Sequence, residues 1–261
     1  MELVSEGQKQ QYARDGYFVL ERVIPDHFLD ILRSKCQLAI DLADAEMDRL
    51  GTDSNRLNHR GKRYFRSGMH ETDPDLNEFL FSDLMAEVCR ATLGENAYLF
   101  NEQYVIKGAD TGMKFSWHQD SGYVGYPNHK PYLSCWCALD DMSEENGTVR
   151  IMPFTRVGIR SFVKHIQEEG SNDQIGYFGD DPGVAAIVPA GSIVVFSSVN
   201  FHCSGSNTTS NMRRSYLAQY SAEPLLSADG NSLWRSAEPL LLNGENAVGQ
   251  PEPEVAAACS D

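Results

Sequence analysis

No stretch of this chain approaches the roughly 18 consecutive apolar residues that a membrane-spanning helix needs. The opening Met-Glu-Leu-Val-Ser-Glu-Gly also lacks the positively charged and apolar regions of a secretory signal. The sequence therefore predicts a cytoplasmic protein that does not span or enter a membrane.

Paired cysteines are also missing. The six cysteines follow neither the spacing of a disulfide scaffold nor that of a zinc site. Cys135 and Cys137 are separated by one residue, so in a strand both thiols would lie on one face. This arrangement favours small buried hydrophobic side chains over metal ligands.

Positive charge is scarce, with 22 Lys and Arg against 37 Asp and Glu and a net charge of −15. Nucleic acids and anionic membrane surfaces are polyanions that such a chain repels, so a small-molecule substrate remains the prediction. The oligomeric state is not indicated. The basic residues between Arg56 and Arg66 form a cluster, which is either a solvated face or a positive surface near an anionic substrate.

The parts of the chain before and after Gly94 differ in the secondary structure that their residue patterns predict. Up to Gly94 the sequence predicts a short strand at 16–20 and helices at 26–49 and 75–93, with Asp26 as the first helix's N-cap. Short β-branched and aromatic runs then follow, separated by turn residues. They lie at 97–105, 133–139, 147–152, 184–188, 192–197 and 215–220. This pattern predicts a mainly β protein with N-terminal helices, built as a double-stranded β-helix or jelly roll.

We expect one domain over residues 1–261, without an internal linker. Residues 1–95 would be a helical support and 96–225 the barrel, with a lid-like insertion at 155–183. Residues 226–261 would be a C-terminal extension whose last ten or so residues are loosely held.

The segment Trp117-His118-Gln119-Asp120 carries the first chemical signal. If it is a strand, His118 and Asp120 project to one face while Gln119 points away. Two histidines and one carboxylate on one side of Fe(II) leave three positions open, as in non-haem iron oxygenases. The HxD pattern alone is common, so a second histidine is needed.

His202 supplies that histidine, just beyond the predicted strand that ends near Phe196. Arg213 follows eleven residues later, where a returning hairpin would bring its guanidinium back beside the metal. A guanidinium pairs with a carboxylate through two parallel hydrogen bonds, which suits the far end of a 2-oxo acid chelating iron. Strand alternation lets only one of Arg213 and Arg214 face inward, and the spacing favours Arg213.

Taken together, these motifs resemble the phytanoyl-CoA dioxygenase family. The resemblance rests on His118-Gln119-Asp120, on Phe196-x-x-x-x-x-His202-x-Ser204 and on the arginine eleven residues after His202. It extends to the opening at 12–20 and to Glu145-Asn-Gly-Thr148, and covers most of residues 8–222. One departure is Pro153-Phe-Thr-Arg156, where the family commonly has Pro-Gly-Ser-His, so use of a coenzyme A thioester is not implied.

The resemblance implies an Fe(II)- and 2-oxoglutarate-dependent dioxygenase that hydroxylates a small molecule with O2, releasing succinate and CO2. By it, His118, Asp120 and His202 are the iron ligands and Arg213 binds the C5 carboxylate of 2-oxoglutarate. It also implies co-substrate contacts by Trp136, Ser204 and Gln103.

Two other functions stay open at this point. One is a metal-binding jelly-roll protein without turnover, and the other is an iron oxygenase that uses no co-substrate. Candidate substrate contacts are Tyr64, Arg66, Tyr123, Tyr126 and Arg156. The remaining histidines are predicted to be surface or loop residues: His27, His59, His70, His129 and His165.

Overall fold

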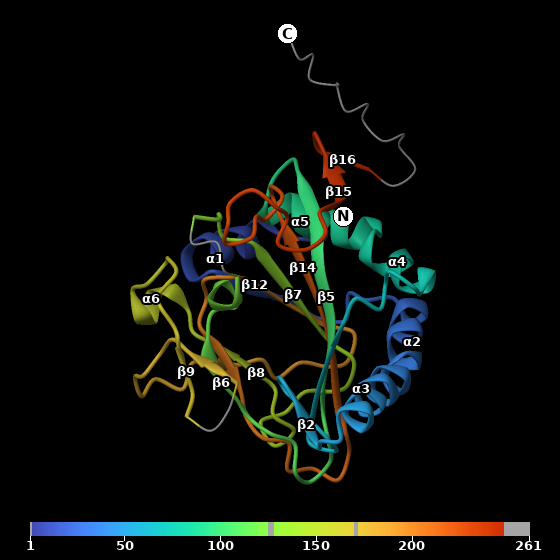
Figure 1. Ribbon diagram of the computed structural model, residues 1–261. Helices are drawn as coiled ribbons and strands as arrows, with labels where there is room; N and C mark the ends of the chain where they lie inside the picture. The colour runs from blue at the N-terminus through green and yellow to red at the C-terminus, as the bar shows by residue number, and fades with distance from the viewer. Residues whose placement is uncertain (1, 125–127, 170–171, 248–261) are drawn as a thin grey trace.

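The fold is built on two main antiparallel sheets that face each other, with helices against the outer face of the larger one (Figure 1) and a separate two-stranded sheet of β9 (Ile166–Gln167) and β10 (Gln174–Ile175). A computed structural model describes residues 2–124, 128–169 and 172–247. The mainly β jelly-roll class predicted from the sequence is confirmed.

The larger sheet has the strand order β1-β12-β7-β14-β5-β4-β3-β2, with β15 also pairing with β5 and β16 with β15. These strands are β1 (Tyr17–Leu20), β2 (Ser54–Asn55), β3 (Asn58–His59), β4 (Arg63–Ser67), β5 (Ala97–Lys107), β7 (Leu133–Ala138), β12 (Ile193–Ser197), β14 (Arg213–Ser221), β15 (Glu238–Leu242) and β16 (Glu245–Asn246). The smaller sheet has the order β11-β8-β13-β6. It comprises β6 (Phe115–His118), β8 (Val149–Ile151), β11 (Val184–Ala185) and β13 (His202–Ser204).

The central strands β7, β12 and β14 are buried on both faces because both faces are covered. Cys135 and Cys137 pack with the helices, whereas the alternate residues Trp136 and Ala138 pack in the space between the sheets. The two cysteines are therefore buried hydrophobic side chains, as predicted.

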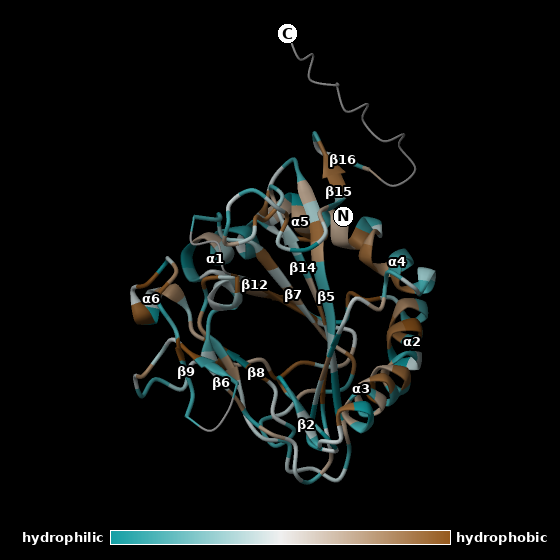
Figure 2. Ribbon diagram, viewed as in Figure 1, coloured by the Kyte–Doolittle hydropathy of each residue, from teal (hydrophilic) through white to brown (hydrophobic). Residues whose placement is uncertain are grey.

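The helices are shorter than predicted. The stretch 26–49 is two helices, α2 (Asp26–Ser34) and α3 (Cys36–Leu50), which meet at Lys35, and Figure 2 shows hydrophobic residues alternating with hydrophilic ones along both. The ammonium of Lys35 lies 2.7 Å from Asp73 and 3.0 Å from Asp75, a tertiary contact that the local sequence does not reveal. Asp26 is the first helical residue rather than the N-cap, which is Pro25.

The predicted helix at 75–93 is likewise divided, into α4 (Pro74–Leu80) and α5 (Asp83–Thr92). The hydroxyl of Ser82 caps α5 by accepting a hydrogen bond from the backbone of Met85. Helix α1 (Glu6–Asp15) precedes β1. The helices within the described residues are all too short or too polar to cross a membrane.

The segment 155–183 contains little regular structure. Only the end of α6 (Phe154–Val157) and the short strands β9 (Ile166–Gln167) and β10 (Gln174–Ile175) are assigned in its described part. The extension after residue 225 is anchored through β15, which pairs with β5. The prediction that the last ten residues are loosely held concerns residues outside the described ranges.

Candidate metal centre and co-substrate pocket

Two strands of the smaller sheet bring the predicted histidines together. His118 ends β6 and His202 begins β13, and the antiparallel register pairs the two residues directly. Asp120 is not on the strand as expected, since a short 3-10 helix, η1 (Asp120–Tyr123), begins there. Its carboxylate Oδ1 nevertheless lies 3.7 Å from His118 Nε2 and 3.4 Å from His202 Nε2.

Both imidazoles are oriented by backbone carbonyls. The Nδ1 of His118 lies 2.7 Å from the carbonyl of Ser116, and the Nδ1 of His202 lies 3.2 Å from that of Asn200. A proton on each Nδ1 donates to that carbonyl and leaves the Nε2 lone pair directed at the shared space, where a metal would take it.

The carboxylate of Asp120 is oriented in the same way. Its Oδ2 accepts hydrogen bonds from Ser134 Oγ at 2.5 Å and from Gln219 Nε2 at 3.0 Å. Oδ1 is thereby left for the metal. The three buried side chains offer ligand atoms that all lie within 4.8 Å of one another.

The protonation states also fit a cation. Burial lowers the pKa of His118 to about 4, so its imidazole is neutral. Burial alone would raise the pKa of Asp120, but the two neighbouring imidazoles hold it well below its usual range. Neutral imidazoles with an ionised carboxylate are the forms that bind a metal ion. Two nitrogens and one oxygen suit Fe(II) with open positions.

A cavity of about 260 Å³ extends from these ligands between the sheets. Its lining includes four residues predicted as co-substrate contacts: Gln103, Trp136, Ser204 and Arg213.

Arg213 is buried at the start of β14. Its Nη1 donates to Ser215 Oγ at 2.7 Å, and its Nη2 donates to the carbonyl of Gly147 at 3.1 Å. Its guanidinium carbon lies 5.6 Å from the ring centre of Trp136, and burial lowers its pKa to about 10. Arg214 instead turns to Asp140, with Nη2 and Oδ1 2.5 Å apart. Of the two arginines, Arg213 is the one that lines the cavity.

Gly147 explains part of the Glu145-Asn-Gly-Thr148 motif. Its φ is +72°, and a Cβ there would lie 2.3 Å from the carbonyl oxygen of Gly205. A residue with a side chain would therefore clash with the Gly205 carbonyl, which accepts from Lys107, and would strain the Gly147 backbone, whose carbonyl accepts from Arg213.

Lys107 is a lining residue that the sequence did not single out. It ends β5 and pairs in register with Arg213. Its ammonium donates to Ser204 Oγ at 2.8 Å and to the carbonyl of Gly205, and burial lowers its pKa to about 6. Within the described residues, no ion pair joins Lys107 or Arg213 to a carboxylate. Arg213 stays charged and Lys107 gains a proton readily beside an anion, so this pair of buried basic groups fits a ligand with negative charge.

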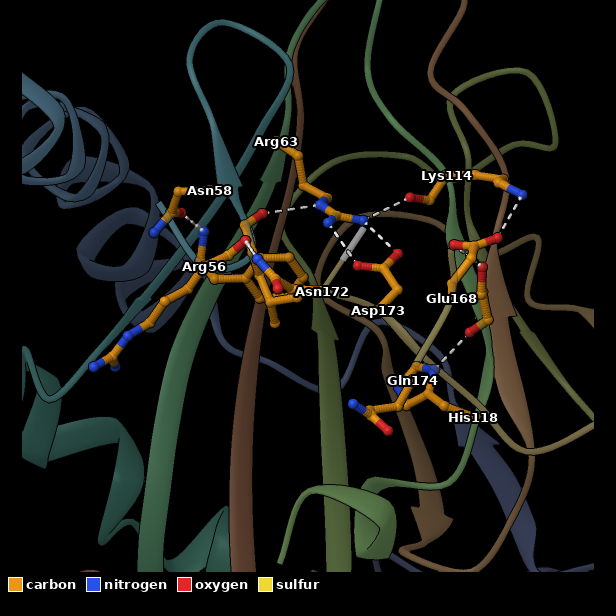
Figure 3. Close-up of polar contacts among 12 residues, drawn as sticks. Arg56, Asn58, Arg63, Lys114, His118, Glu168, Asn172, Asp173 and Gln174 are labelled. Atoms are coloured by element: carbon orange, nitrogen blue, oxygen red, sulfur yellow. Dashed lines mark hydrogen bonds and ion pairs between the residues drawn. The ribbon is translucent and has the colours of Figure 1, made fainter. Parts of the chain in front are cut away.

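The segment 155–183 is fastened beside this cavity (Figure 3). Arg63 of β4 forms a bidentate ion pair with Asp173, at 2.9 and 2.7 Å, and both side chains are almost fully buried. Lys114 forms an exposed pair with Glu168 at 3.3 Å. Gln119 points away from the metal ligands, as predicted. Its side-chain amide donates a hydrogen bond to the carbonyl of Ser161 and accepts one from the backbone N–H of Val163.

The residues predicted to contact substrate divide into one that lines the cavity and others that do not. Tyr123 lines the cavity, as do Arg63 and Phe65 of β4. Tyr64 and Arg66 do not line the cavity, because alternation along β4 turns them to the other side, where Tyr64 donates to Asp44. Arg156 does not line it either, since it is exposed and pairs with Asp181. Tyr126 lies outside the described residues.

Two of the histidines predicted to be surface or loop residues, His70 and His165, lie in loops as predicted but are not surface residues. His70 is buried between Glu102 and Glu238, with ring nitrogens at 3.2 and 2.9 Å from their carboxylates. His165 is half-buried beside the metal ligands, and its Nε2 accepts a hydrogen bond from the backbone of Gln119 at 2.8 Å. Neither contact has a local sequence signal.

The family model for phytanoyl-CoA dioxygenase matches residues 12–215. The chain belongs to this family. Among curated relatives, ectoine dioxygenase of Bordetella bronchiseptica is 26% identical over 233 residues, covering 78% of this chain and 71% of that protein. L-proline trans-4-hydroxylase of Streptomyces griseoviridis is 23% identical over 237 residues, covering 81% and 84%.

Solved structures agree on the fold of this phytanoyl-CoA dioxygenase family member. EctD from S. alaskensis, crystallised with 2-oxoglutarate and 5-hydroxyectoine, has a TM-score of 0.66 at 21% identity, covering 92% of this chain and 87% of the other. The non-heme monooxygenase ThoJ, without ligand, has a TM-score of 0.69 at 19% identity, covering 92% and 84%.

Proposed function

We propose that His118, Asp120 and His202 hold Fe(II) in this enzyme and that Arg213 binds the C5 carboxylate of 2-oxoglutarate. The family places the chain among the 2-oxoglutarate-dependent non-haem iron dioxygenases. The observation that carries the residue roles is the convergence of two imidazoles and one carboxylate, with a buried arginine on the same cavity.

When bound, iron would supply the oxidative chemistry that splits 2-oxoglutarate into succinate and CO2 and hydroxylates the substrate with O2. The protein's own part is geometric and electrostatic. The carbonyls of Ser116 and Asn200 hold the imidazoles, while Ser134 and Gln219 hold the carboxylate so that one oxygen faces the metal.

The co-substrate side of the cavity supports a dianionic ligand. Arg213 supplies a fixed cation, and a carboxylate next to Lys107 would raise the pKa of that amine and favour its charged ammonium form. Trp136 would cover the guanidinium from the side, and Ser204 and Gln103 offer polar groups along the same wall. All five residues come from the larger sheet or from β13.

Our proposed outcome is hydroxylation of a small molecule. Relatives are named for action on ectoine and on L-proline, two compact polar compounds. The cytoplasm is our proposed location, on the sequence features described above.

Succinate release tests this function. Purified protein with Fe(II) and 2-oxoglutarate should form succinate in aerobic buffer, even without substrate, at a slow uncoupled rate. His202→Ala should abolish it, whereas Lys130→Gln, on the surface, should not. Protein that forms no succinate would be a binding module. Oxygen uptake that is independent of 2-oxoglutarate would instead point to an oxygenase without this co-substrate.

A further inference from the structure

The cavity differs in charge from the rest of this acidic chain. Four basic side chains line it, namely Arg63, Lys107, Arg213 and Arg235, and Asp120 is the acidic lining residue. Asp173 neutralises Arg63, and the proposed function assigns Lys107 and Arg213 to 2-oxoglutarate. Arg235 has no such partner, since within the described residues no ion pair joins it to a carboxylate.

Arg235 lies at the mouth of the cavity, between β14 and β15 in the chain. Its guanidinium carbon lies 4.7 Å from the ring centre of Trp234, which orients the planar group. The charge of Glu102 reaches Arg235 through space, but that carboxylate is bound to His70. An arginine has five N–H donors, and one bond to Asn101 leaves several for a ligand.

A chain of hydrogen bonds connects Arg235 to the metal centre. Asp120 only accepts, so the Gln219 amide turns its nitrogen to Asp120, at 3.0 Å, and its oxygen toward Asn101. Asn101 therefore donates to Gln219 at 2.7 Å and presents its own oxygen outward, where Nη1 of Arg235 donates to it. The orientation of each amide follows from its neighbour, and the chain ends on a positioned cation.

The remaining lining is largely apolar. It includes aromatic and aliphatic side chains, namely Leu57, Phe65, Phe115, Tyr123, Tyr132 and Trp234. Two amide side chains separate the guanidinium from Asp120. A molecule held at Arg235 by one end would therefore extend its body past these two amides toward the metal.

From these observations we propose that Arg235 is the substrate's anchor and that the substrate is a small carboxylic acid with a partly apolar body. This inference rests on the proposed function, because it assigns Lys107 and Arg213 to 2-oxoglutarate. Arg235 would bind the carboxylate at the cavity mouth, while the apolar body lies against the aromatic wall with a C–H bond facing the metal.

Binding can be measured without turnover. Trp234 lies against Arg235, so ligand binding should change the tryptophan fluorescence of the anaerobic holoenzyme carrying Fe(II) and 2-oxoglutarate. The probes are hexanoate, 3-phenylpropanoate and N-acetyl-L-proline, each compared with its primary amide. We expect the acids to bind and the amides to bind about 10- to 100-fold more weakly.

Arg235→Gln should weaken acid binding by a similar factor and remove the preference for acids over amides. Arg235→Lys should keep part of that preference, and Lys130→Gln, which removes a surface charge, should leave it unchanged. Equal binding of acids and amides, unchanged acid binding in Arg235→Gln, or no saturable binding of any acid would each overturn the proposal.

The two proposals fail separately. Absence of succinate from wild-type protein would refute the 2-oxoglutarate-dependent reaction itself. Normal uncoupled succinate release together with acid binding that ignores residue 235 would refute only the role of Arg235.

Discussion

His118, Asp120 and His202 are each held by a second group, and for Asp120 these groups come from other strands. Ser134 lies on β7 and Gln219 on β14, yet both donate to the same oxygen of Asp120. Such contacts keep a ligand oriented before the metal arrives, so their loss weakens metal binding without removing a ligand.

Ser134→Ala should therefore raise the Kd for Co(II), used as a stable substitute for Fe(II), by roughly 10-fold. Gln219 would still hold the carboxylate, so binding should weaken rather than disappear. Spectroscopic titration with Co(II) measures this, with Ser34→Ala on the exposed end of α2 as control. Unchanged affinity in Ser134→Ala would show that the serine does not orient the carboxylate.

The neighbouring arginines provide a matched comparison. Arg213→Gln should raise the KM for 2-oxoglutarate by at least about 10-fold, because a charge-assisted contact is lost. Arg214→Gln should leave the KM near the wild-type value, since Arg214 pairs with Asp140 outside the cavity. Steady-state succinate assays decide between them, and an equal rise in both variants would contradict the assignment.

The sequence predicted the residues whose spacing carries a pattern. His118, Asp120 and His202 were predicted from strand alternation and motif, and the structure brings all three together. Lys107 and Arg235 were not predicted. Lys107 lies next to Arg213 because β5 and β14 pair in that register, and Arg235 contacts Asn101 because the C-terminal extension folds back along β5. Neither contact has a signal in the local sequence.

At the scale of elements, one buried ion pair, Arg63–Asp173, attaches the segment 155–183 to the larger sheet alongside weaker exposed and hydrogen-bonded contacts. Arg63 also donates to the carbonyls of Leu57 and Lys114, so its guanidinium joins β4, the chain before β6 and the segment itself. Whether the segment acts as a lid stays a prediction. The contribution of the Arg63–Asp173 ion pair to the stability of the protein can, however, be measured.

Asp173→Asn should destabilise the protein by about 3 kcal/mol or more, because it leaves a buried arginine without its counter-charge. Lys114→Gln, which breaks the exposed pair with Glu168, should cost less than about 1 kcal/mol. Denaturant unfolding gives both values, and hydrogen exchange should show the loss concentrated in residues 154–184. Similar small effects in both variants would mean that the Arg63 pair contributes little.

Element types were more predictable than element ends. The apolar periodicity of 26–49 continues across Lys35, and only the tertiary contacts of Lys35 with Asp73 and Asp75 accompany the break. Strands such as β5 and β14 were predicted because their β-branched and aromatic runs are long. β13 has three residues and was not predicted as a strand, because a run that short carries no periodicity.

On the scale of the whole molecule, His70 connects β5 to the C-terminal extension through Glu102 and Glu238. These carboxylates raise the pKa of His70 to about 9, whereas an unfolded histidine titrates near 6.5. The charged imidazole therefore stabilises the fold fully below about pH 6.5, and this contribution is lost as the pH rises through about 9.

The free energy of unfolding should consequently fall between pH 6.5 and 9 by an amount on the order of 3 kcal/mol from this site. His70→Gln should show a much shallower fall over that range, whatever its stability at neutral pH. Urea unfolding at several pH values measures the slope, with the exposed His27→Gln as control. Equal slopes in wild type and His70→Gln would contradict the assignment.

His118 and His202 sit opposite each other on strands β6 and β13, which are distant in sequence. A single ion held by both would act as a cross-link between those strands, in addition to its chemical role. Iron supply would then set how long each molecule survives as well as how fast it works. A cell short of iron would have both less activity and a shorter-lived enzyme.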